Sequence, residues 1–338
     1  MNDRSFQSFA DKSLAGDSLN DVECQAVLAA TREDLLPLLS AAFQVREKAF
    51  GRRVKIHVLM NAKSGLCPED CGYCSQSSVS TADIEKFAWL STEDLVQGAV
   101  IAREARALRY CLVASGRGPT DQEIEHVAEA VRAIKRAVPL EICCSLGLLT
   151  EEKAKRLKAA GVDRVNHNLN TSGSFYSEIC STHTYQDRIE TIRNARSAGL
   201  EICSGGIVGM GEKDSDIISL ARAVRELACD SVPVNFLHPI PGTPLENERN
   251  LDPARCLKVL CLFRFLNPRT EIRIGGGREH NLRSLQAMAL YPADALFVNG
   301  YLTTPGQPAT DAHRMIEDMG FEVEVSAHHA SNSTEASA

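Results

Sequence analysis

Two kinds of hydrophobic pattern alternate along residues 53–320. Short segments with apolar side chains at every second position predict β-strands, and segments with apolar side chains at helical spacing follow each of them. The strands are expected at 53–60, 109–114, 140–145, 163–168, 200–207, 231–237, 271–275 and 295–298. The helices are expected at 92–108, 121–137, 151–160, 185–198, 214–228, 253–266, 279–289 and 309–319.

Eight strand–helix units predict an α/β fold, namely a closed (β/α)8 barrel of the TIM type. Such barrels typically take about 250 residues, which is close to the length of this region. An open parallel sheet covered by helices is the alternative architecture. Local signals support two of the helix starts, because Thr120 and Glu123 match a capping box and Asp252 precedes Pro253 in a first turn.

The two ends of the chain have different patterns. Residues 1–50 are expected to form an N-terminal helical extension, with helices at 20–30 and 33–49 that could cap the amino end of the barrel or pack on a second subunit. Residues 323–338 are expected to form a disordered tail, because the stretch from 325 onward is rich in Ser, Thr and Ala and lacks apolar periodicity. The barrel domain is therefore expected at 51–322.

The polar positions within the strands are unusual for a barrel. The sequence Leu-Glu-Ile-Cys occurs at 140–143 and again at 200–203, and a period of two puts Leu and Ile on one face and Glu and Cys on the other. The apolar face must pack under the helices, so the polar face is expected to point into the barrel. The expected interior side chains are Arg109, Cys111, Glu141, Cys143, Asn166, Asn168, Asn170, Glu201, Cys203, Asn235, Glu271 and Arg273.

Burying such side chains is costly unless each finds a partner. The pattern therefore predicts an interior that holds polar ligands or metal rather than a dry apolar core. An antiparallel sheet with one solvated face is the alternative interpretation, but the eight intervening helices disfavour it.

Charge and composition exclude several classes of protein. Lys and Arg number 37 against 44 Asp and Glu, a net charge of −7 that argues against a basic nucleic-acid-binding face. No apolar run approaches the ~20 residues of a membrane span, and the polar first 20 residues lack a signal-peptide core, so a cytoplasmic protein is expected. Twelve cysteines in such a chain indicate metal ligation or catalysis rather than a disulfide framework.

Three of these cysteines lie close together after the first predicted strand. Cys67, Cys71 and Cys74 form a C-x3-C-x2-C motif at the carboxyl end of the barrel, where such folds carry their chemistry. Thiolates suit iron–sulfur clusters or zinc. Three thiolates leave either kind of site one ligand short, and His57 could supply the fourth ligand of a zinc site, although its strand position is more typical of an ordinary barrel residue.

The cysteine motif, with Tyr73 immediately before Cys74, resembles the signature of the radical S-adenosylmethionine superfamily. In that superfamily three thiolates hold a 4Fe–4S cluster whose open iron binds S-adenosylmethionine, and reductive cleavage yields a 5′-deoxyadenosyl radical. The segments 110–116, 166–172, 203–209, 241–245 and 302–305 narrow the resemblance to the biotin synthase family and extend it over almost the whole barrel.

The resemblance implies a sulfurtransferase that inserts sulfur into dethiobiotin to form biotin, the last step of biotin biosynthesis. It further implies that a 2Fe–2S cluster, the sulfur donor, is bound by Cys111, Cys143, Cys203 and Arg273, all expected inside the barrel. The period of two turns the adjacent Cys144 toward the helices, which favours Cys143 as the ligand. Arginine is an unusual ligand, since a protonated guanidinium has no free lone pair; it either binds as a neutral group or stabilises cluster charge.

The same resemblance implies contacts for the two small molecules. Those for S-adenosylmethionine are Tyr73, Asn168, Asn170, Arg188 and Gly206. Those for dethiobiotin are Asn166, Asn235, Thr303 and Thr304. Some family members have Asp at the Asn170 position, and an amide binds ribose hydroxyls less strongly than a carboxylate does.

The resemblance also favours a homodimer and a flavodoxin or ferredoxin as electron donor. The cysteines outside the two ligand sets are interpreted as small buried hydrophobes or surface thiols, namely Cys24, Cys144, Cys180, Cys229, Cys256 and Cys261. No shared role is expected for His126, His183, His238, His280 and His313. The alternatives are a radical enzyme with a different product, which would not consume a second cluster, and a non-enzymatic zinc or iron–sulfur module.

Overall fold

The computed structural model describes residues 3–325, and the side chains from Phe6 onward. Most of the predicted tail, from residue 326, lies outside the described residues. At the boundary expected for the barrel domain, a short strand, β10 (Glu322–Val323), pairs with Arg53 and Val54.

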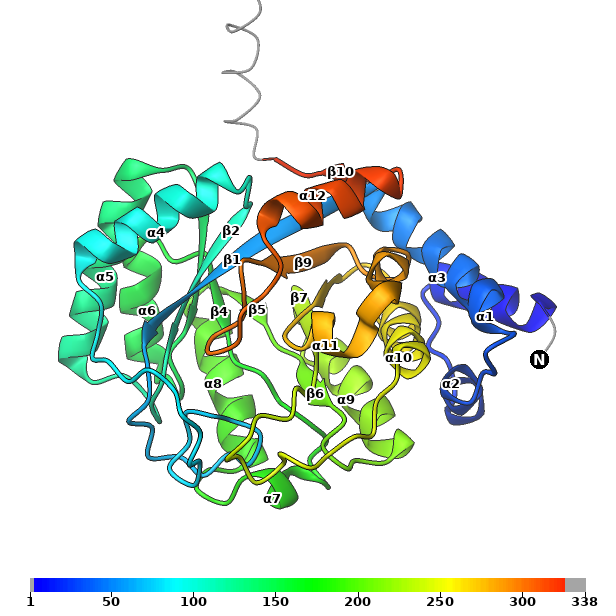
Figure 1. The fold of residues 1–338 in the computed structure, drawn as a ribbon, viewed down its shortest axis with the longest axis horizontal. Coiled ribbons are helices and arrows are strands. Elements are labelled where there is room, and N and C mark those ends of the chain that lie inside the picture. The colour runs from blue at the N-terminus through cyan, green and yellow to red at the C-terminus, as the bar shows by residue number, and fades with distance from the viewer. Residues whose placement is uncertain (1–2, 326–338) are drawn as a thin grey trace, which may run out of the picture.

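Parallel strands close into a barrel at the centre of the molecule (Figure 1). The strands are β1 (Arg53–Lys63), β2 (Arg109–Ala114), β3 (Glu141–Ser145), β4 (Arg164–Asn166), β5 (Glu201–Cys203), β6 (Gly206–Val208), β7 (Ser231–Phe236), β8 (Glu271–Ile274) and β9 (Ala295–Val298). Each pairs with its neighbour, β6 joins β7, and β9 returns to β1 with Lys55 opposite Ala295. This closure confirms the barrel prediction over the open-sheet alternative.

Helices surround the strands (Figure 1). They are α4 (Thr92–Glu104), α5 (Asp121–Ala137), α6 (Glu151–Ala160), α7 (Tyr176–Ile179), α8 (Tyr185–Ser197), α9 (Asp214–Glu226), α10 (Pro253–Leu266), α11 (Arg278–Leu282), the 3-10 helix η1 (Arg283–Leu290) and α12 (Ala309–Asp318). The capping box of Thr120 and Glu123 and the Asp252 cap before Pro253 are both present. The single helix expected at 279–289 is instead α11 followed by η1, and α7 was not anticipated.

The strand expected at 200–207 is interrupted by Ser204 and Gly205, giving β5 and β6. A Cβ at Gly205 would lie 2.0 Å from the carbonyl oxygen of Pro233, and a Cβ at Gly206 would lie 2.5 Å from that of Asn170. These close approaches require glycine, and they let β6 turn onto β7 rather than continue β5.

The N-terminal extension packs on the flank and amino end of its own barrel. It contains α1 (Asp3–Ala15), which the hydrophobic pattern did not delimit, α2 (Asp21–Leu28) and α3 (Leu35–Phe50), beside α10 in Figure 1. The fully buried Arg46 donates to the carbonyl of Arg53 at 2.7 Å and to that of Ala293 at 3.4 Å, where strands begin. The extension therefore caps the barrel, as one of the two interpretations proposed.

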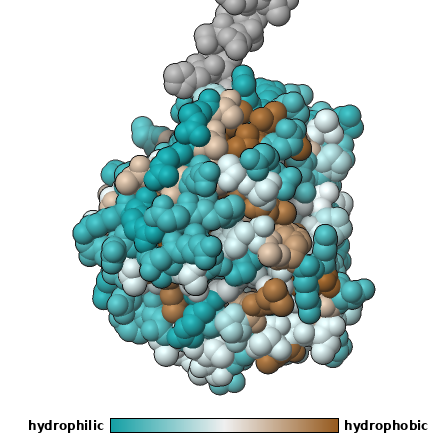
Figure 2. Space-filling view, turned by 90° about the vertical axis from the view of Figure 1, so that its left-hand side faces the viewer, coloured by the Kyte–Doolittle hydropathy of each residue, from teal (hydrophilic) through white to brown (hydrophobic). Residues whose placement is uncertain are grey.

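The apolar strand faces and the inner helix faces form one large core that includes Ile142, Cys144 and Ile202. The outer surface is mostly hydrophilic with separate hydrophobic areas on the face shown in Figure 2. Within residues 3–325, none of the helices has the combination of length and apolar character that crossing a bilayer requires.

Candidate active site

A cavity of about 290 Å³ opens at the carboxyl ends of the strands. Its walls bring together most of the residues that the sequence singled out. They are Cys67, Cys71, Tyr73, Cys74, Cys111, Cys143, Asn166, Asn168, Asn170, Arg188, Asn235, Arg273, Thr303 and Thr304. Cys203 is fully buried beside this set, and Gly206 is also outside the cavity wall.

The C-x3-C-x2-C motif lies in the loop after β1, and its three cysteines are in the cavity wall. The sulfur of Cys67 accepts hydrogen bonds from the backbone N–H groups of Glu69 and Gly116, and burial raises its pKa. Burial raises the pKa of Cys74 to about 11. Both groups are therefore neutral thiols at pH 7 without a metal, and metal binding has to displace their protons.

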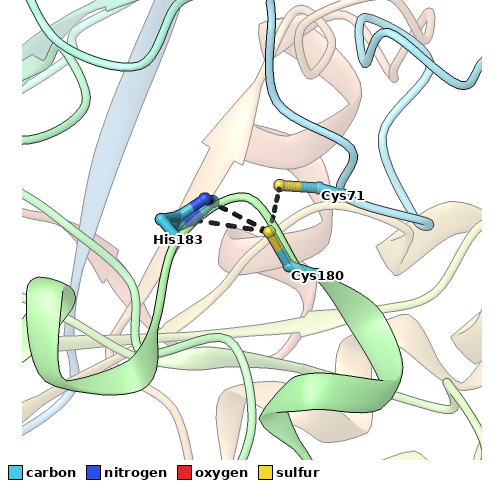
Figure 3. Close-up of side chains that lie close together, drawn as sticks. All are labelled: Cys71, Cys180 and His183. Atoms are coloured by element: carbon cyan, nitrogen blue, oxygen red, sulfur yellow. Dashed lines mark hydrogen bonds between the residues drawn. The ribbon is translucent and has the colours of Figure 1, made fainter.

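Cys71, the second cysteine of the motif, has a thiol neighbour that the sequence interpretation missed. Cys71 Sγ lies 3.7 Å from Cys180 Sγ, and His183 Nδ1 lies 3.2 Å from Cys180 Sγ (Figure 3). Cys180 is buried, in keeping with its interpretation as a small buried hydrophobe or surface thiol, but its contacts with Cys71 and His183 bring three possible ligand atoms within 4.8 Å of one another, a grouping that the sequence did not indicate. Cys71 and Cys180 are 109 residues apart, so no local pattern could have indicated the contact.

The second predicted ligand set lies deeper in the barrel. Cys111 and Cys143 are opposite each other on β2 and β3, and they form a small cluster with Phe297. The contact with Cys143 lowers the pKa of Cys111, and the same contact raises the pKa of Cys143. Arg273 donates to Cys203 Sγ at 2.5 Å. The four side chains that the strand alternation pointed inward therefore meet in the interior.

Arg273 is held by neighbours on several strands. Its guanidinium is hydrogen-bonded to His57 Nδ1 and to Ser231 Oγ, both at 2.9 Å, and it lies over the Phe297 ring at 4.8 Å. Burial opposes its charge, but Cys203 and then Glu271 outweigh that effect and raise the pKa of Arg273. His57 is thus part of this deeper network rather than a ligand beside the cysteine motif.

Below this group, one buried carboxylate is surrounded by cations. Glu271 Oε1 lies 3.3 Å from Arg164 and 3.5 Å from Arg109, and it accepts a hydrogen bond from Ser231 Oγ at 2.6 Å. Burial would raise its pKa, but Arg109, His57 and Arg164 together hold the pKa of Glu271 well below the usual range. Arg164 was not among the expected interior residues, although it shares the strand parity of Asn166 and so could have been found.

Polar side chains near the cysteine motif fix one another. Asn170 Nδ2 donates to Tyr73 Oη at 2.6 Å, and burial raises the pKa of Tyr73 well above its usual value. Arg188 donates to the carbonyl of Asn168 at 2.9 Å and to His183 Nε2 at 2.6 Å. These contacts hold the Arg188 guanidinium and the Asn170 amide at the cavity wall.

The residues expected to meet substrate line other parts of the same cavity. Asn166 Nδ2 lies 3.2 Å from Cys203 Sγ, and Asn235 Oδ1 accepts from the N–H of Gly276 at 2.8 Å. Thr303 Oγ1 lies 2.8 Å from Ser75 Oγ. Thr304 follows it in the cavity wall and donates to the carbonyl of Tyr301 at 2.7 Å.

Comparison with solved structures supports the architecture. Methylornithine synthase has a TM-score of 0.84 at 20% identity, with 96% of this chain and 99% of that chain covered. The FeFe-hydrogenase maturase HydG from Carboxydothermus hydrogenoformans has a TM-score of 0.79 at 20% identity, covering 94% and 79%. At this level of identity the likeness concerns the fold alone.

Residues 63–224 match the family model of the radical SAM superfamily, and residues 233–322 match the biotin and thiamin synthesis associated domain. A barrel with a three-cysteine loop at its carboxyl end, together with the first match, defines a radical S-adenosylmethionine enzyme. Biotin synthase of Bacillus subtilis (strain 168) is 52% identical over 319 residues, 94% of this chain and 95% of the relative. Biotin synthase of Lysinibacillus sphaericus is 52% identical over 316 residues, with 94% and 95% covered. The chain belongs to the biotin synthase family.

Proposed function

We propose that this enzyme inserts sulfur into dethiobiotin to form biotin, with a 4Fe–4S cluster at Cys67, Cys71 and Cys74. The observation that carries the proposal is the presence of two thiol sets at one cavity, with the loop cysteines and Cys111 and Cys143 in its wall and Cys203 buried beside them. When bound, the first cluster and S-adenosylmethionine supply a 5′-deoxyadenosyl radical that abstracts hydrogen, and a 2Fe–2S cluster supplies the sulfur.

The donor chemistry of both sites fits these groups. Three thiols in one loop leave one position of a four-iron cluster open for a small molecule. In the deeper site, Cys111, Cys143 and Cys203 offer three thiols and Arg273 offers a guanidinium. Within the described residues, Nε of the buried Arg273 has no hydrogen-bond partner, which leaves it free to interact with a bound group.

Arg188 is the residue that we propose for the carboxylate of S-adenosylmethionine. Its contacts with the Asn168 carbonyl and with His183 fix the guanidinium at the cavity wall before any ligand binds. A preorganised guanidinium binds a carboxylate strongly because it presents parallel N–H donors. Asn168, Asn170 and Tyr73 offer neutral donors and acceptors beside it for the remaining polar groups.

We propose Asn166, Asn235, Thr303 and Thr304 as contacts of dethiobiotin. All four are neutral hydrogen-bonding groups in the cavity wall. A ureido ring and a carboxylate tail need donors and acceptors of this kind. Gly206 is also proposed as a contact of S-adenosylmethionine, and its lack of a side chain allows β6 to approach Asn170 and Asn235 closely.

The chain must also keep water and stray hydrogen donors away from a radical reaction. Leu59, Phe297 and Tyr301 pack around Cys111 and Cys143 and add apolar surface to the cavity wall beside them. Positioning and exclusion are thus the tasks of these side chains, since an unactivated C–H bond has to lie close to the attacking carbon.

We further propose a homodimeric cytoplasmic enzyme reduced by a flavodoxin or ferredoxin. The twelve cysteines are all free thiols, a state that a reducing compartment maintains. The N-terminal extension packs on its own barrel, so the dimer contact would involve its outer face or another surface. Light scattering of the anaerobic protein tests the oligomeric state.

The decisive experiment is anaerobic reconstitution with iron and sulfide, followed by incubation with dethiobiotin, S-adenosylmethionine and a reductant. Biotin is expected, with two 5′-deoxyadenosines formed for each biotin. The Cys111→Ala/Cys203→Ala variant is expected to cleave S-adenosylmethionine without forming biotin and to bind less iron. Unchanged iron content in that variant would contradict sulfur insertion from a second cluster and favour a radical enzyme with another product.

A further inference from the structure

The thiol of Cys180 lies beside one of the proposed cluster ligands, at the end of α7. Its sulfur is 3.7 Å from that of Cys71, and both side chains are almost fully enclosed, at 6% and 8% exposure (Figure 3). This separation corresponds to sulfur atoms in van der Waals contact. A disulfide would require the two sulfurs to approach from this distance to about 2.0 Å.

Hydrogen bonds join the two main-chain segments that carry these thiols. The N–H of Gly72 donates to the carbonyl of Ile179 at 2.9 Å, and the Asp70 carboxylate accepts from the N–H of Ser181 at 3.0 Å. Residues on both sides of the thiol pair are therefore hydrogen-bonded across the gap. A disulfide needs Cα atoms about 4.4–6.8 Å apart, and hydrogen bonds on both sides of the pair keep the two main chains adjacent.

The other two cysteines of the motif are oriented differently. The sulfur of Cys67 faces the backbone N–H groups of Glu69 and Gly116, and that of Cys74 faces those of Gln76 and Ser77. Cys71 differs because, within residues 3–325, its sulfur contacts the thiol of Cys180. His183 Nδ1 lies 3.2 Å from the Cys180 sulfur, and the ligand atoms of Cys71, Cys180 and His183 are all within 4.8 Å of one another.

We propose that Cys71 and Cys180 form a reversible disulfide in the cluster-free chain. This disulfide would prevent cluster assembly until it is reduced, and we call it the redox lock. The proposal rests on the proposed function only in taking Cys71 as a cluster ligand. A low-molecular-weight disulfide of the glutathione class is the oxidant. One protein thiolate attacks this oxidant, forms a mixed disulfide and releases the first small thiol. The second protein thiolate then attacks the mixed disulfide and releases the second small thiol. Two protein thiols are thereby oxidised to one S–S bond, and one small-molecule disulfide is reduced to two thiols.

The disulfide and the cluster are mutually exclusive, because the Cys71 sulfur cannot bond to both Cys180 and iron. An oxidised chain therefore has two cysteines of the motif available instead of three. Reduction by a dithiol restores the third and permits assembly. The lock would also protect the Cys71 thiol from irreversible oxidation while no cluster is present.

The test uses the full-length chain, stripped of iron by a chelator under anaerobic reducing conditions and then treated with oxidised glutathione. Proteolysis and mass spectrometry are expected to find a peptide pair joined through Cys71 and Cys180. Cys180→Ser is expected to lack this cross-link, and Cys229→Ser, at a buried thiol elsewhere, to retain it. A cross-link from Cys71 to Cys67 or Cys74 in the wild type would overturn the proposal.

A second measurement follows iron binding during reconstitution. The oxidised wild type is expected to lose most iron binding and to regain it with dithiothreitol, whereas Cys180→Ser treated in the same way binds iron without dithiothreitol once glutathione is removed. An equal loss of iron binding in the oxidised wild type and in the oxidised Cys180→Ser variant would overturn the redox lock. If neither reduced protein binds iron at the motif, the cluster assignment fails, while the cross-link result still decides whether the disulfide forms.

Discussion

Cys143 and Cys144 are adjacent in β3, yet they lie on opposite sides of the barrel wall. Cys143 packs with Cys111 in the interior, whereas Cys144 belongs to the core between strands and helices. Successive side chains of a strand point to opposite faces, so the pair is a matched comparison of one chemical group in two environments.

Replacing each of these cysteines separately therefore tests the second ligand set. Cys143→Ala is expected to abolish most of the 2Fe–2S signal in Mössbauer spectra of reconstituted protein. Cys144→Ala is expected to retain it and to lower the free energy of unfolding by about 1 kcal/mol, since it only removes packing. Equal loss of the 2Fe–2S signal in both variants would mean that the substitutions act by disturbing the structure, not by removing a cluster ligand.

The buried carboxylate of Glu271 is expected to be among the most important charges for stability. Glu271→Gln removes the buried anion that Arg109 and Arg164 share, and the free energy of unfolding is expected to fall by about 3–5 kcal/mol in urea denaturation. Glu201→Gln is the control, because Glu201 also contacts Arg164 but its side chain is 53% exposed. That change is expected to cost about 1 kcal/mol or less.

Glu123 on α5 is expected to give a defined pH dependence of stability. It contacts Lys63 at 2.8 Å and Trp89 Nε1 at 2.7 Å. Burial opposes ionisation, but these partners lower the pKa to about 2 from the ordinary value of 4.5. A lowered folded-state pKa means that the stabilisation is complete above 4.5 and is lost as the pH falls toward 2.

The stability difference between wild type and Glu123→Gln should therefore be constant from neutral pH to about 4.5 and shrink below it. Urea unfolding of the full-length, cluster-free chain at several pH values measures this difference. Glu129→Gln, at an exposed position of the same helix, is the control and should show no such trend. A difference that grows on acidification would contradict the assignment.

Arg188 and Arg196 lie on the same helix, α8, so comparing their variants tests which arginine contributes to S-adenosylmethionine binding. Arg188→Met removes the guanidinium from the cavity wall and is expected to weaken binding by about tenfold or more, as loss of a charged hydrogen bond does. Arg196→Met removes a charge that is 43% exposed and lies outside the cavity wall, so affinity should not change. Equilibrium dialysis of reconstituted protein measures both, and an unchanged affinity for Arg188→Met would reject its proposed role.

Local sequence patterns determined the strands of this protein and the direction of their side chains. The alternation of polar and apolar residues identified the strands, placed Cys111, Cys143, Cys203 and Arg273 on the interior face and turned Cys144 outward, because side-chain direction in a strand depends only on position along the chain. The spacing of the motif and the resemblance to known families were likewise contained in the amino-acid order alone.

The tertiary structure decided what depends on the meeting of distant segments. The contact of Cys71 with Cys180, the group of arginines around Glu271 and the docking of the N-terminal helices all join residues far apart in the chain. The break between β5 and β6 depends on how closely Gly205 approaches Pro233. A hydrophobic period describes which face of an element is buried, but it contains no information about which other element covers that face or which loops meet above it.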